Sequence, residues 1–199
     1  MNSLAGEAAA SRPCLLCFGY GYTARFLARV CLEAGWRVIG TRRPGEDTAA
    51  ESDGVEIFLF DRQTPLAGEI IGAATHILSS VPPDKDGDPV LDVHGQNLAA
   101  AQDLRWLGYL STTGVYGDRK GGWVDEESKL SPAGQRGERR CAAEAAWLTL
   151  RRDFAQAVHI FRLAGIYGPG RSALDTVRGG KAKRIVKPGQ VFSRIHVAD

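Results

Sequence analysis

The sequence predicts an α/β protein built on a doubly wound parallel sheet, with helices on both faces and a smaller C-terminal region. Three observations lead to this fold class. Short apolar runs of strand length alternate with stretches of helical apolar periodicity. A glycine-rich turn connects the first run to the first helical stretch at residues 19–24. With 199 residues, of which 44% are hydrophobic, the chain is long enough for one sizeable domain and a fragment of a second.

The strands are expected at apolar runs that are followed by turn residues or by a helical pattern. These runs cover residues 14–18, 36–39, 55–60, 75–79, 106–110 and 157–163. Helices are expected between them, from the glycine turn as far as Gly35, and over 66–74, 90–104 and 130–150. The 130–150 stretch has Pro132 in its first turn and apolar residues on one side, so it is the best amphipathic helix in the chain.

The glycine turn has the spacing G-x-G-x-x-A. In this pattern Gly19 permits a tight turn, Gly21 lets the backbone approach a pyrophosphate closely, and a small Ala24 lets the helix pack on the strand. The free N–H groups at the start of the helix would face the phosphates, where the helix dipole favours negative charge. A purely structural turn is the alternative. The predicted phosphate-binding residues are Gly19, Tyr20, Gly21, Tyr22, Thr23 and Ala24.

The end of the second strand bears on the choice of cofactor. An acidic residue about 20 positions after the glycines would bind the ribose 2′-hydroxyl of NAD. This chain has Thr41, Arg42 and Arg43 there instead, and guanidinium groups suit a 2′-phosphate. The sequence therefore favours NADP over NAD. An ordinary solvated strand end is the alternative for the two arginines.

Polar residues also follow the third and fourth expected strands. Asp61 closes the third strand, where it would either meet the adenine or cap the following turn. Ser79, Ser80 and Val81 precede two prolines that end the fourth strand, so they are expected near the cofactor. The charged residues at 84–88 are expected to form a solvated turn.

Composition excludes several classes of protein. A formal net charge of +2 is too small to imply a nucleic-acid partner. No apolar run approaches the roughly 18 residues that a membrane span needs. Residues 1–13 are rich in alanine and small polar residues and lack a cationic start, so we expect a mobile tail, no signal peptide and a cytoplasmic protein.

The cysteines and histidines predict no metal or disulfide. Cys14 and Cys17 form a C-x-x-C, but residues three apart on a strand point to opposite faces, so both are expected in the core. The histidines show no metal-ligand spacing with them.

Four segments in order resemble the short-chain dehydrogenase/reductase superfamily, in its extended, epimerase/dehydratase-like branch. They are GYGYTA at 19–24, STTGVYG at 111–117, RLAGIYGP at 162–169 and IHVAD at 195–199. The resemblance implies an NAD(P)-binding Rossmann domain at 14–165 and the start of a truncated substrate-binding region at 166–199. Family members usually continue well beyond the last segment.

Family catalysis uses a Ser or Thr after the fifth strand to hold the substrate oxygen, and Thr112 matches this role by position. It also uses a Tyr-x-x-x-Lys pair on the next helix, where the lysine lowers the pKa of the phenol. Here Arg136 and Arg140 occupy those positions, and arginine cannot exchange a proton at neutral pH. This replacement is similar to the atypical subgroup of the superfamily. Tyr116 and Lys120 also have the spacing, but in a glycine-rich loop, so we interpret that match as coincidence.

Another proton donor is then required if the chain is an enzyme. Tyr116 is the candidate catalytic residue beside Thr112, and Asp125, Glu126 and His196 are further candidates by location. Arg136, Arg140 and Glu144 share one helix face, which would either bind an anion or be a solvated charged stripe.

The resemblance implies an NAD(P)-linked oxidoreductase, or an epimerase/dehydratase-like enzyme, acting on a small carbonyl, a hydroxyl or a sugar nucleotide, and Arg42 and Arg43 favour NADP as its cofactor. The alternative is a dinucleotide-binding sensor or scaffold that has lost the Tyr/Lys pair and performs no catalysis. A third alternative is a truncated, inactive product. Family members often pair through helices beside the sheet, and the 130–150 helix could serve in a homodimer.

Overall fold

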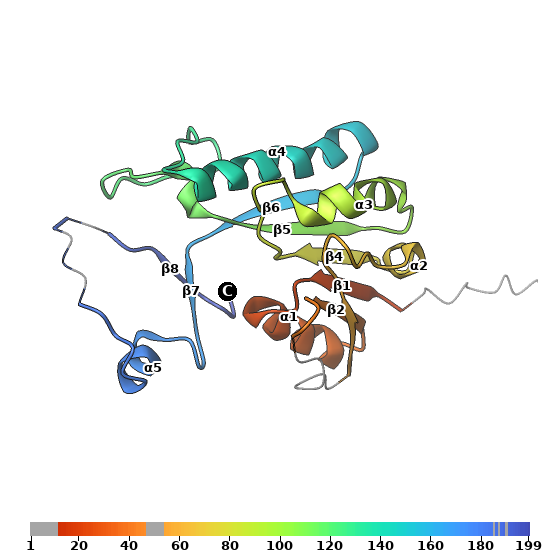
Figure 1. The fold of residues 1–199 in the computed structure, drawn as a ribbon, viewed down its shortest axis with the longest axis horizontal. Coiled ribbons are helices and arrows are strands. Elements are labelled where there is room, and N and C mark those ends of the chain that lie inside the picture. The colour runs from red at the N-terminus through yellow and green to blue at the C-terminus, as the bar shows by residue number, and fades with distance from the viewer. Residues whose placement is uncertain (1–11, 47–53, 185, 187, 190) are drawn as a thin grey trace, which may run out of the picture.

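The computed structural model describes residues 12–46, 54–184, 186, 188–189 and 191–199. Its main sheet has the order β3-β2-β1-β4-β5-β6, and every neighbouring pair is parallel (Figure 1). The strand order reverses between β1 and β4, so the predicted doubly wound parallel sheet is confirmed. The strands are β1 Cys14–Phe18, β2 Arg37–Arg42, β3 Val55–Leu59, β4 His76–Ser79, β5 Trp106–Thr112 and β6 Val158–Leu163.

Helices lie on both faces of this sheet. Figure 1 shows α3, Pro89–Ala100, and α4, Gln135–Phe154, on one side, and α1, Tyr22–Glu33, on the other. A short helix, α2 at Gly68–Gly72, joins β3 to β4. Both faces are covered because right-handed crossovers place helices on opposite sides when the winding direction reverses.

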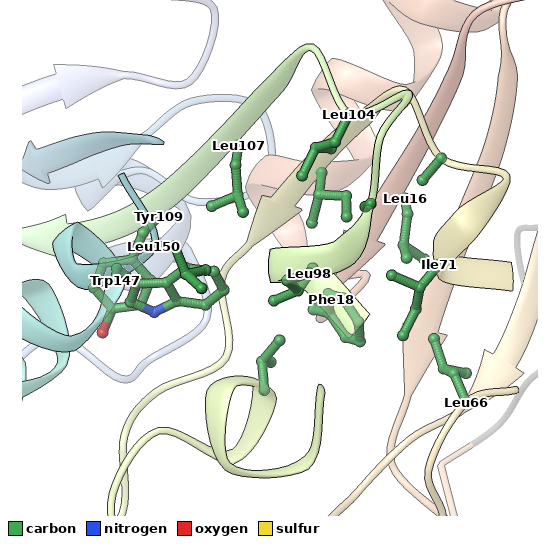
Figure 2. Close-up of a cluster of buried hydrophobic side chains, with 14 of the residues drawn as sticks. Leu16, Phe18, Leu66, Ile71, Leu98, Leu104, Leu107, Tyr109, Trp147 and Leu150 are labelled. Carbon is green, nitrogen blue, oxygen red and sulfur yellow. The ribbon is translucent and has the colours of Figure 1, made fainter. Parts of the chain in front are cut away.

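The alternation of side chains along β1 divides the core into two clusters. Leu16 and Phe18 pack in the larger one with Leu98 of α3 and Trp147 of α4 (Figure 2). Leu15 packs in the other cluster with Ala24 and Ala28 of α1. All of these side chains are buried, as expected of a parallel strand covered on both faces.

Cys14 and Cys17 are buried free thiols that lie in different clusters. Burial raises the pKa of the Cys17 thiol, which keeps it protonated and unreactive. The prediction that the C-x-x-C points to opposite faces is confirmed. Within the described ranges, no group of three or more His, Cys, Asp or Glu side chains could hold a metal ion.

The predicted helix at 130–150 begins too early. The structure starts α4 at Gln135, because Gly134 takes a φ of +81° that a helix does not allow. Pro132 therefore lies before the helix, where the backbone N–H of Ser131 bonds to the carbonyl of Val115 at 3.0 Å. The helix ends later than predicted, at Phe154, where Ala155 takes the left-handed conformation.

A small C-terminal unit was not predicted in detail. It contains a parallel two-stranded sheet of β7, Gly165–Tyr167, and β8, Arg194–His196, with the helix α5 at Ala173–Arg178 between them. A single turn of 3-10 helix, η1 at Thr113–Tyr116, follows β5. In the part of the chain that the structure describes, no helix is long and apolar enough to cross a membrane.

Candidate cofactor site and active centre

A cavity of about 560 Å³ opens at the carboxyl ends of the strands, at the point where the strand order reverses. This is where ligands bind in open α/β sheets. Its walls come from the glycine turn, the ends of β2 and β3, and the segment after β4. Of the predicted cofactor residues, the cavity is lined by Gly19, Tyr20, Gly21, Arg42, Arg43, Asp61, Ser80 and Val81.

The two glycines of the turn have different local environments. Gly19 has a φ of +84°, and a Cβ added there would lie 2.6 Å from the Oγ of Ser80. Gly21 has an ordinary φ of −96°, and a Cβ added there would meet no atom within 4 Å. Gly19 is therefore required by the turn itself, whereas Gly21 leaves open space above the start of α1.

The turn is fixed by backbone contacts that leave the helix start open. Thr41 of β2 accepts the N–H of Gly19 at its Oγ1, at 2.9 Å, and the N–H of Tyr20 at its carbonyl, at 2.7 Å. Ser80 donates its hydroxyl to the carbonyl of Gly19 at 2.8 Å. Among the described residues, no side chain caps the N-terminus of α1. Its first turn, which is fully described, contains no acidic residue. The N-terminal N–H groups and the positive end of the dipole thus fit a pyrophosphate.

Four of the predicted cofactor residues lie outside the cavity lining. Ala24 packs in the core, and Ser79 is fully buried on β4. Tyr22 donates its hydroxyl to the carbonyl of Pro169 at 3.1 Å, which ties the start of α1 to the C-terminal unit. Thr23, in the first turn of α1, is partly exposed.

The side chain of Asp61 caps the turn that follows β3. Its Oδ1 accepts the backbone N–H groups of Gln63, at 2.8 Å, and Thr64, at 2.7 Å. The same residue lines the cavity, so its turn-capping role and contact with a ligand are compatible. Arg43 lies at the cavity rim with Glu46, whose carboxylate is 3.4 Å from its Nε, and both side chains are largely exposed.

The sequence interpretation missed Arg62, which also lines the cavity. Its Nε and Nη2 each donate to Asp84 at 3.0 Å, and its Nη1 donates to Asp92 of α3 at 2.6 Å. The hydrogen bond from Arg62 lowers the pKa of Asp84 below its ordinary value. Lys85 and Asp86 are exposed, as expected of a solvated turn. Asp84 ties the turn to the segment after β3 and Asp88 is buried, so the expectation was wrong for these two residues. No sequence spacing links Arg62 to Asp84 and Asp92.

The residue in the substrate-oxygen position, Thr112, ends β5. Its Oγ1 accepts the N–H of Gly114 at 3.1 Å and so caps η1. The hydroxyl proton is not used in that contact, and the side chain is partly exposed. Thr112 can therefore donate to a ligand oxygen.

Arg140, in the lysine position, makes structural contacts. Its Nη1 donates to the hydroxyl of Tyr109 at 2.9 Å and to the carbonyl of Leu110 at 2.7 Å, which joins α4 to β5. Its guanidinium also lies over the Tyr109 ring, 5.6 Å from the centroid. Burial raises the pKa of Tyr109 to about 12, so this phenol stays protonated at neutral pH. Arg136, in the tyrosine position, is exposed.

Comparison with known proteins gives matches among solved structures alone. No family model and no curated protein matches the chain. A conserved protein of unknown function from Silicibacter pomeroyi is 47% identical, with a TM-score of 0.82 over 94% of this chain and 64% of that one. A protein provisionally named an NAD-dependent epimerase/dehydratase, from Methylobacillus flagellatus, is 25% identical, with a TM-score of 0.67 over 94% and 66%.

The chain has the fold of the extended, epimerase/dehydratase-like branch of the short-chain dehydrogenase/reductase superfamily. The UDP-glucuronic acid 4-epimerase of Bacillus cereus has the same fold, at 19% identity and a TM-score of 0.72 over 93% of this chain and 69% of that one. The chain spans 64% of the Silicibacter protein's length and 66% of the Methylobacillus protein's length.

In this extended short-chain dehydrogenase/reductase fold, a buried polar network lies beside Thr112. The side chain of Glu144 on α4 is only 3% exposed. It accepts the hydroxyl of Ser111 at 2.5 Å and the Nη2 of Arg162, from β6, at 2.9 Å. The interpretation of Arg136, Arg140 and Glu144 as a solvated stripe was therefore wrong for the last two, because tertiary contacts bury polar atoms that helical spacing alone cannot reveal.

Tyr116 joins this network from η1. Its hydroxyl oxygen accepts the Nη1 of Arg162 at 2.9 Å, and the guanidinium lies 5.1 Å from the ring centroid. Since a guanidinium has donors and no acceptor, the phenolic proton is directed elsewhere. Among the described residues no acceptor takes it. Lys120 lies in a loop with a φ of +52°, so it shares no α-helix with Tyr116, as expected from the glycine-rich sequence.

The other three candidate proton donors differ in their contacts. Asp125 accepts the hydroxyl of Ser128 at 2.7 Å and is exposed. The carbonyl of Glu126 accepts the Nη1 of Arg162 at 3.4 Å. His196 of β8 packs edge to face against Tyr167, with 5.1 Å between the ring centroids.

Proposed function

We propose that this protein binds a nicotinamide dinucleotide in the 560 Å³ cavity, with NADP favoured over NAD. The observation that carries the proposal is the uncapped start of α1 beside open space at Gly21, with Arg42 and Arg43 lining the same cavity. The names of the related structures support a nicotinamide cofactor: one is an NAD-dependent epimerase/dehydratase by name, and the Bacillus cereus epimerase is described in complex with NAD.

Residues of the cavity would hold the different parts of the cofactor. The N–H groups at the start of α1 would bind the pyrophosphate, and Arg42 and Arg43 would bind the 2′-phosphate. Asp61 would lie near the adenine, and Ser80 and Val81 would line the opposite wall. When bound, a nicotinamide ring supplies hydride transfer.

The reaction we propose is that of an oxidoreductase or epimerase-like enzyme on a small carbonyl, a hydroxyl or a sugar nucleotide. Thr112 would donate to the substrate oxygen, and Tyr116 would supply the proton. The support for Tyr116 is its hydrogen bond from Arg162, which leaves the phenolic proton available. On reduction of a carbonyl that proton moves to the new hydroxyl, and Tyr116 regains a proton from solvent.

A non-catalytic dinucleotide sensor is the second candidate, and one observation favours it. Arg140 donates to Tyr109 and to the backbone of β5, so the position of the family's lysine serves packing. The fold and the cofactor cavity can persist without turnover.

Thermal unfolding of the chain with NADPH, with NADH and with neither tests the proposed cofactor. A ligand that binds only the folded state stabilises it by about 2.7 kcal/mol at a hundredfold excess over its Kd. We expect NADPH to stabilise the protein more than NADH does. This difference between the two cofactors should be lost in Arg43→Gln, because the exposed guanidinium lies at the cavity rim. Arg29→Gln, an exposed arginine on α1 outside the cavity lining, is the matched control. No stabilisation by either cofactor would rule the proposal out.

Turnover separates the two candidate functions. Oxidation of NADPH with a panel of carbonyl compounds should be lost in Tyr116→Phe and Thr112→Val, while stabilisation by NADPH is retained in both. Wild-type protein that binds NADPH and reduces no carbonyl in the panel would favour the sensor.

A further inference from the structure

Arg62 connects three parts of the cavity wall. It follows Asp61 directly after β3, Asp84 lies in the loop after β4, and Asp92 lies in the first turn of α3. The two Asp84 contacts are both 3.0 Å long and use both carboxylate oxygens, and the Asp92 contact is 2.6 Å long. Such a bidentate pair fixes direction as well as distance. The side chain of Arg62 is only 30% exposed.

The charge of Arg62 is already matched. Two carboxylates contact one guanidinium, so the group of three carries a net negative charge. A phosphate at this group would be repelled by both carboxylates, whereas an arginine without acidic neighbours would attract it. Arg62 therefore differs in role from Arg43, whose contact with Glu46 is longer, at 3.4 Å, and whose side chain is 79% exposed.

The loop that Arg62 holds forms one wall of the cavity. Pro82, Pro83, Asp84 and Pro89 all line it. Asp84 also closes the loop internally, because its Oδ1 accepts the N–H of Asp86 at 2.8 Å and its own N–H bonds to the carbonyl of Gly87 at 2.9 Å.

The far end of the same loop is fixed by a buried residue. Asp88 is 4% exposed and caps α3, accepting the N–H of Val90 at 2.9 Å. Its other oxygen accepts the indole N–H of Trp147 in α4 at 2.9 Å. The segment at 82–89 is thus attached to the core at its C-terminal end through Asp88, and among the described residues Arg62 attaches it to the loop that follows β3.

We propose that Arg62 is a positioning residue that holds the 82–89 segment in its ligand-binding position before a cofactor arrives. This inference rests on the proposed dinucleotide function. Because the wall is already ordered, binding does not incur the entropy cost of fixing it. The role is independent of the 2′-phosphate, so it applies equally to NADP and NAD.

The first test measures Kd for NADPH and NADH in Arg62→Met. We expect both affinities to fall by the same factor, about threefold to tenfold, as for the loss of a partly buried charged contact. Arg62→Lys should recover part of the loss, since an ammonium keeps the charge but not the bidentate contact. Arg37→Met is the matched control. Arg37 makes a similar bidentate pair with Glu56, at 2.6 and 2.7 Å, at the start of β2, which is the end away from the cavity. This variant should leave both affinities unchanged.

The second test needs no cofactor. Lys85 is an exposed trypsin site inside the loop, and its side chain pairs only with Asp86, at 3.0 Å, among the described residues. Cleavage after Lys85, followed by mass spectrometry under native conditions, should be faster in Arg62→Met than in wild type or Arg37→Met.

The outcomes distinguish this inference from the proposed function. A loss confined to NADPH would make Arg62 a phosphate ligand and overturn the positioning role. Unchanged affinities, or unchanged cleavage after Lys85, would overturn it as well. If the wild-type protein binds neither cofactor, the proposed function is wrong. The positioning role in ligand binding is then wrong too, even if the cleavage result shows that Arg62 fixes the loop.

Discussion

The two halves of the sheet differ in how many of the polar groups beside them are hydrogen-bonded within the protein. Around β1 and β2, the glycine turn leaves the start of α1 uncapped and Gly21 beside open space. Around β5 and β6, Arg140 and Glu144 of α4 direct their polar atoms into hydrogen bonds with the sheet. One half leaves backbone N–H groups and open space at the cavity, and the other uses charged side chains to join a helix to two strands. The family's catalytic positions lie in the second half.

The second half shows that another side chain can take over the position of the family's catalytic lysine and make structural contacts there. Arg140 takes the lysine position and contacts both a buried phenol and a backbone carbonyl. A guanidinium stays protonated at neutral pH, so Arg140 cannot replace the family's lysine in proton transfer, and these two contacts give it a structural role instead. The proposed chemistry therefore depends on other groups, and we assign it to Thr112 at the end of β5 and Tyr116 in η1.

The largest expected effect comes from opening the β5–β6 network. In Glu144→Gln the guanidinium of Arg162, 19% exposed, loses its charged partner. Breaking a buried ion pair on one side should lower the free energy of unfolding by about 3 kcal/mol. Urea unfolding measures this. Glu138→Gln, on the exposed side of the same helix, is the control and should change stability by less than about 0.5 kcal/mol. Equal stability of the two variants would mean that the network contributes little.

The second prediction compares the two glycines of the other half. Gly19→Ala should destabilise the protein by about 1–2 kcal/mol, because its φ of +84° is a left-handed conformation. Gly21→Ala keeps an allowed φ of −96° and should cost less, but its methyl group would occupy the space above the start of α1. We expect it to weaken NADPH binding about tenfold or more, or 1.4 kcal/mol. Similar effects of both changes on stability and binding would contradict the division of roles.

The sheet could be predicted from the sequence because each strand is a short apolar run between turn signals. β1 was predicted residue for residue at Cys14–Phe18, and β3, β4 and β6 differ by one residue at one end. The start of α4 could not, since Pro132 resembles a first-turn proline while the φ of Gly134 is a property of the folded loop. The strands β7 and β8 are only three residues each and pair across a long insertion, which leaves no periodic pattern to read.

The candidate site divides in the same way. The glycine turn and the arginines of β2 carry local spacing, and most of those residues line the cavity. Arg62 and Arg162 carry none, because their partners lie 22 and 18 residues away in sequence, at Asp84 and Glu144. Contacts of this kind depend on strand order and helix placement. They become visible only when the fold is known.

The smallest expected effect is a pH dependence that belongs to the cofactor half. His94 of α3 is 3% exposed and packs against the rings of Phe18 and Phe60. Its Nε2 accepts the N–H of Leu66 at 3.2 Å, which requires an unprotonated nitrogen there. Burial lowers the pKa of His94 below its ordinary value of 6.5.

Because the folded pKa is the lower one, the neutral ring is favoured in the folded protein. The unfolded chain therefore binds more protons in this range, and stability should fall as the pH drops below about 6.5 toward the folded pKa. Urea unfolding at pH 7.5 and 5.5 should show the decrease, and His94→Gln should reduce it. His76, whose pKa burial also lowers, remains in that variant and should leave a residual slope. His159→Gln, at an exposed position on β6, is the control. If the pH dependence of the free energy of unfolding is unchanged in His94→Gln, other groups cause it. The two halves of the sheet would then not differ in their response to acid.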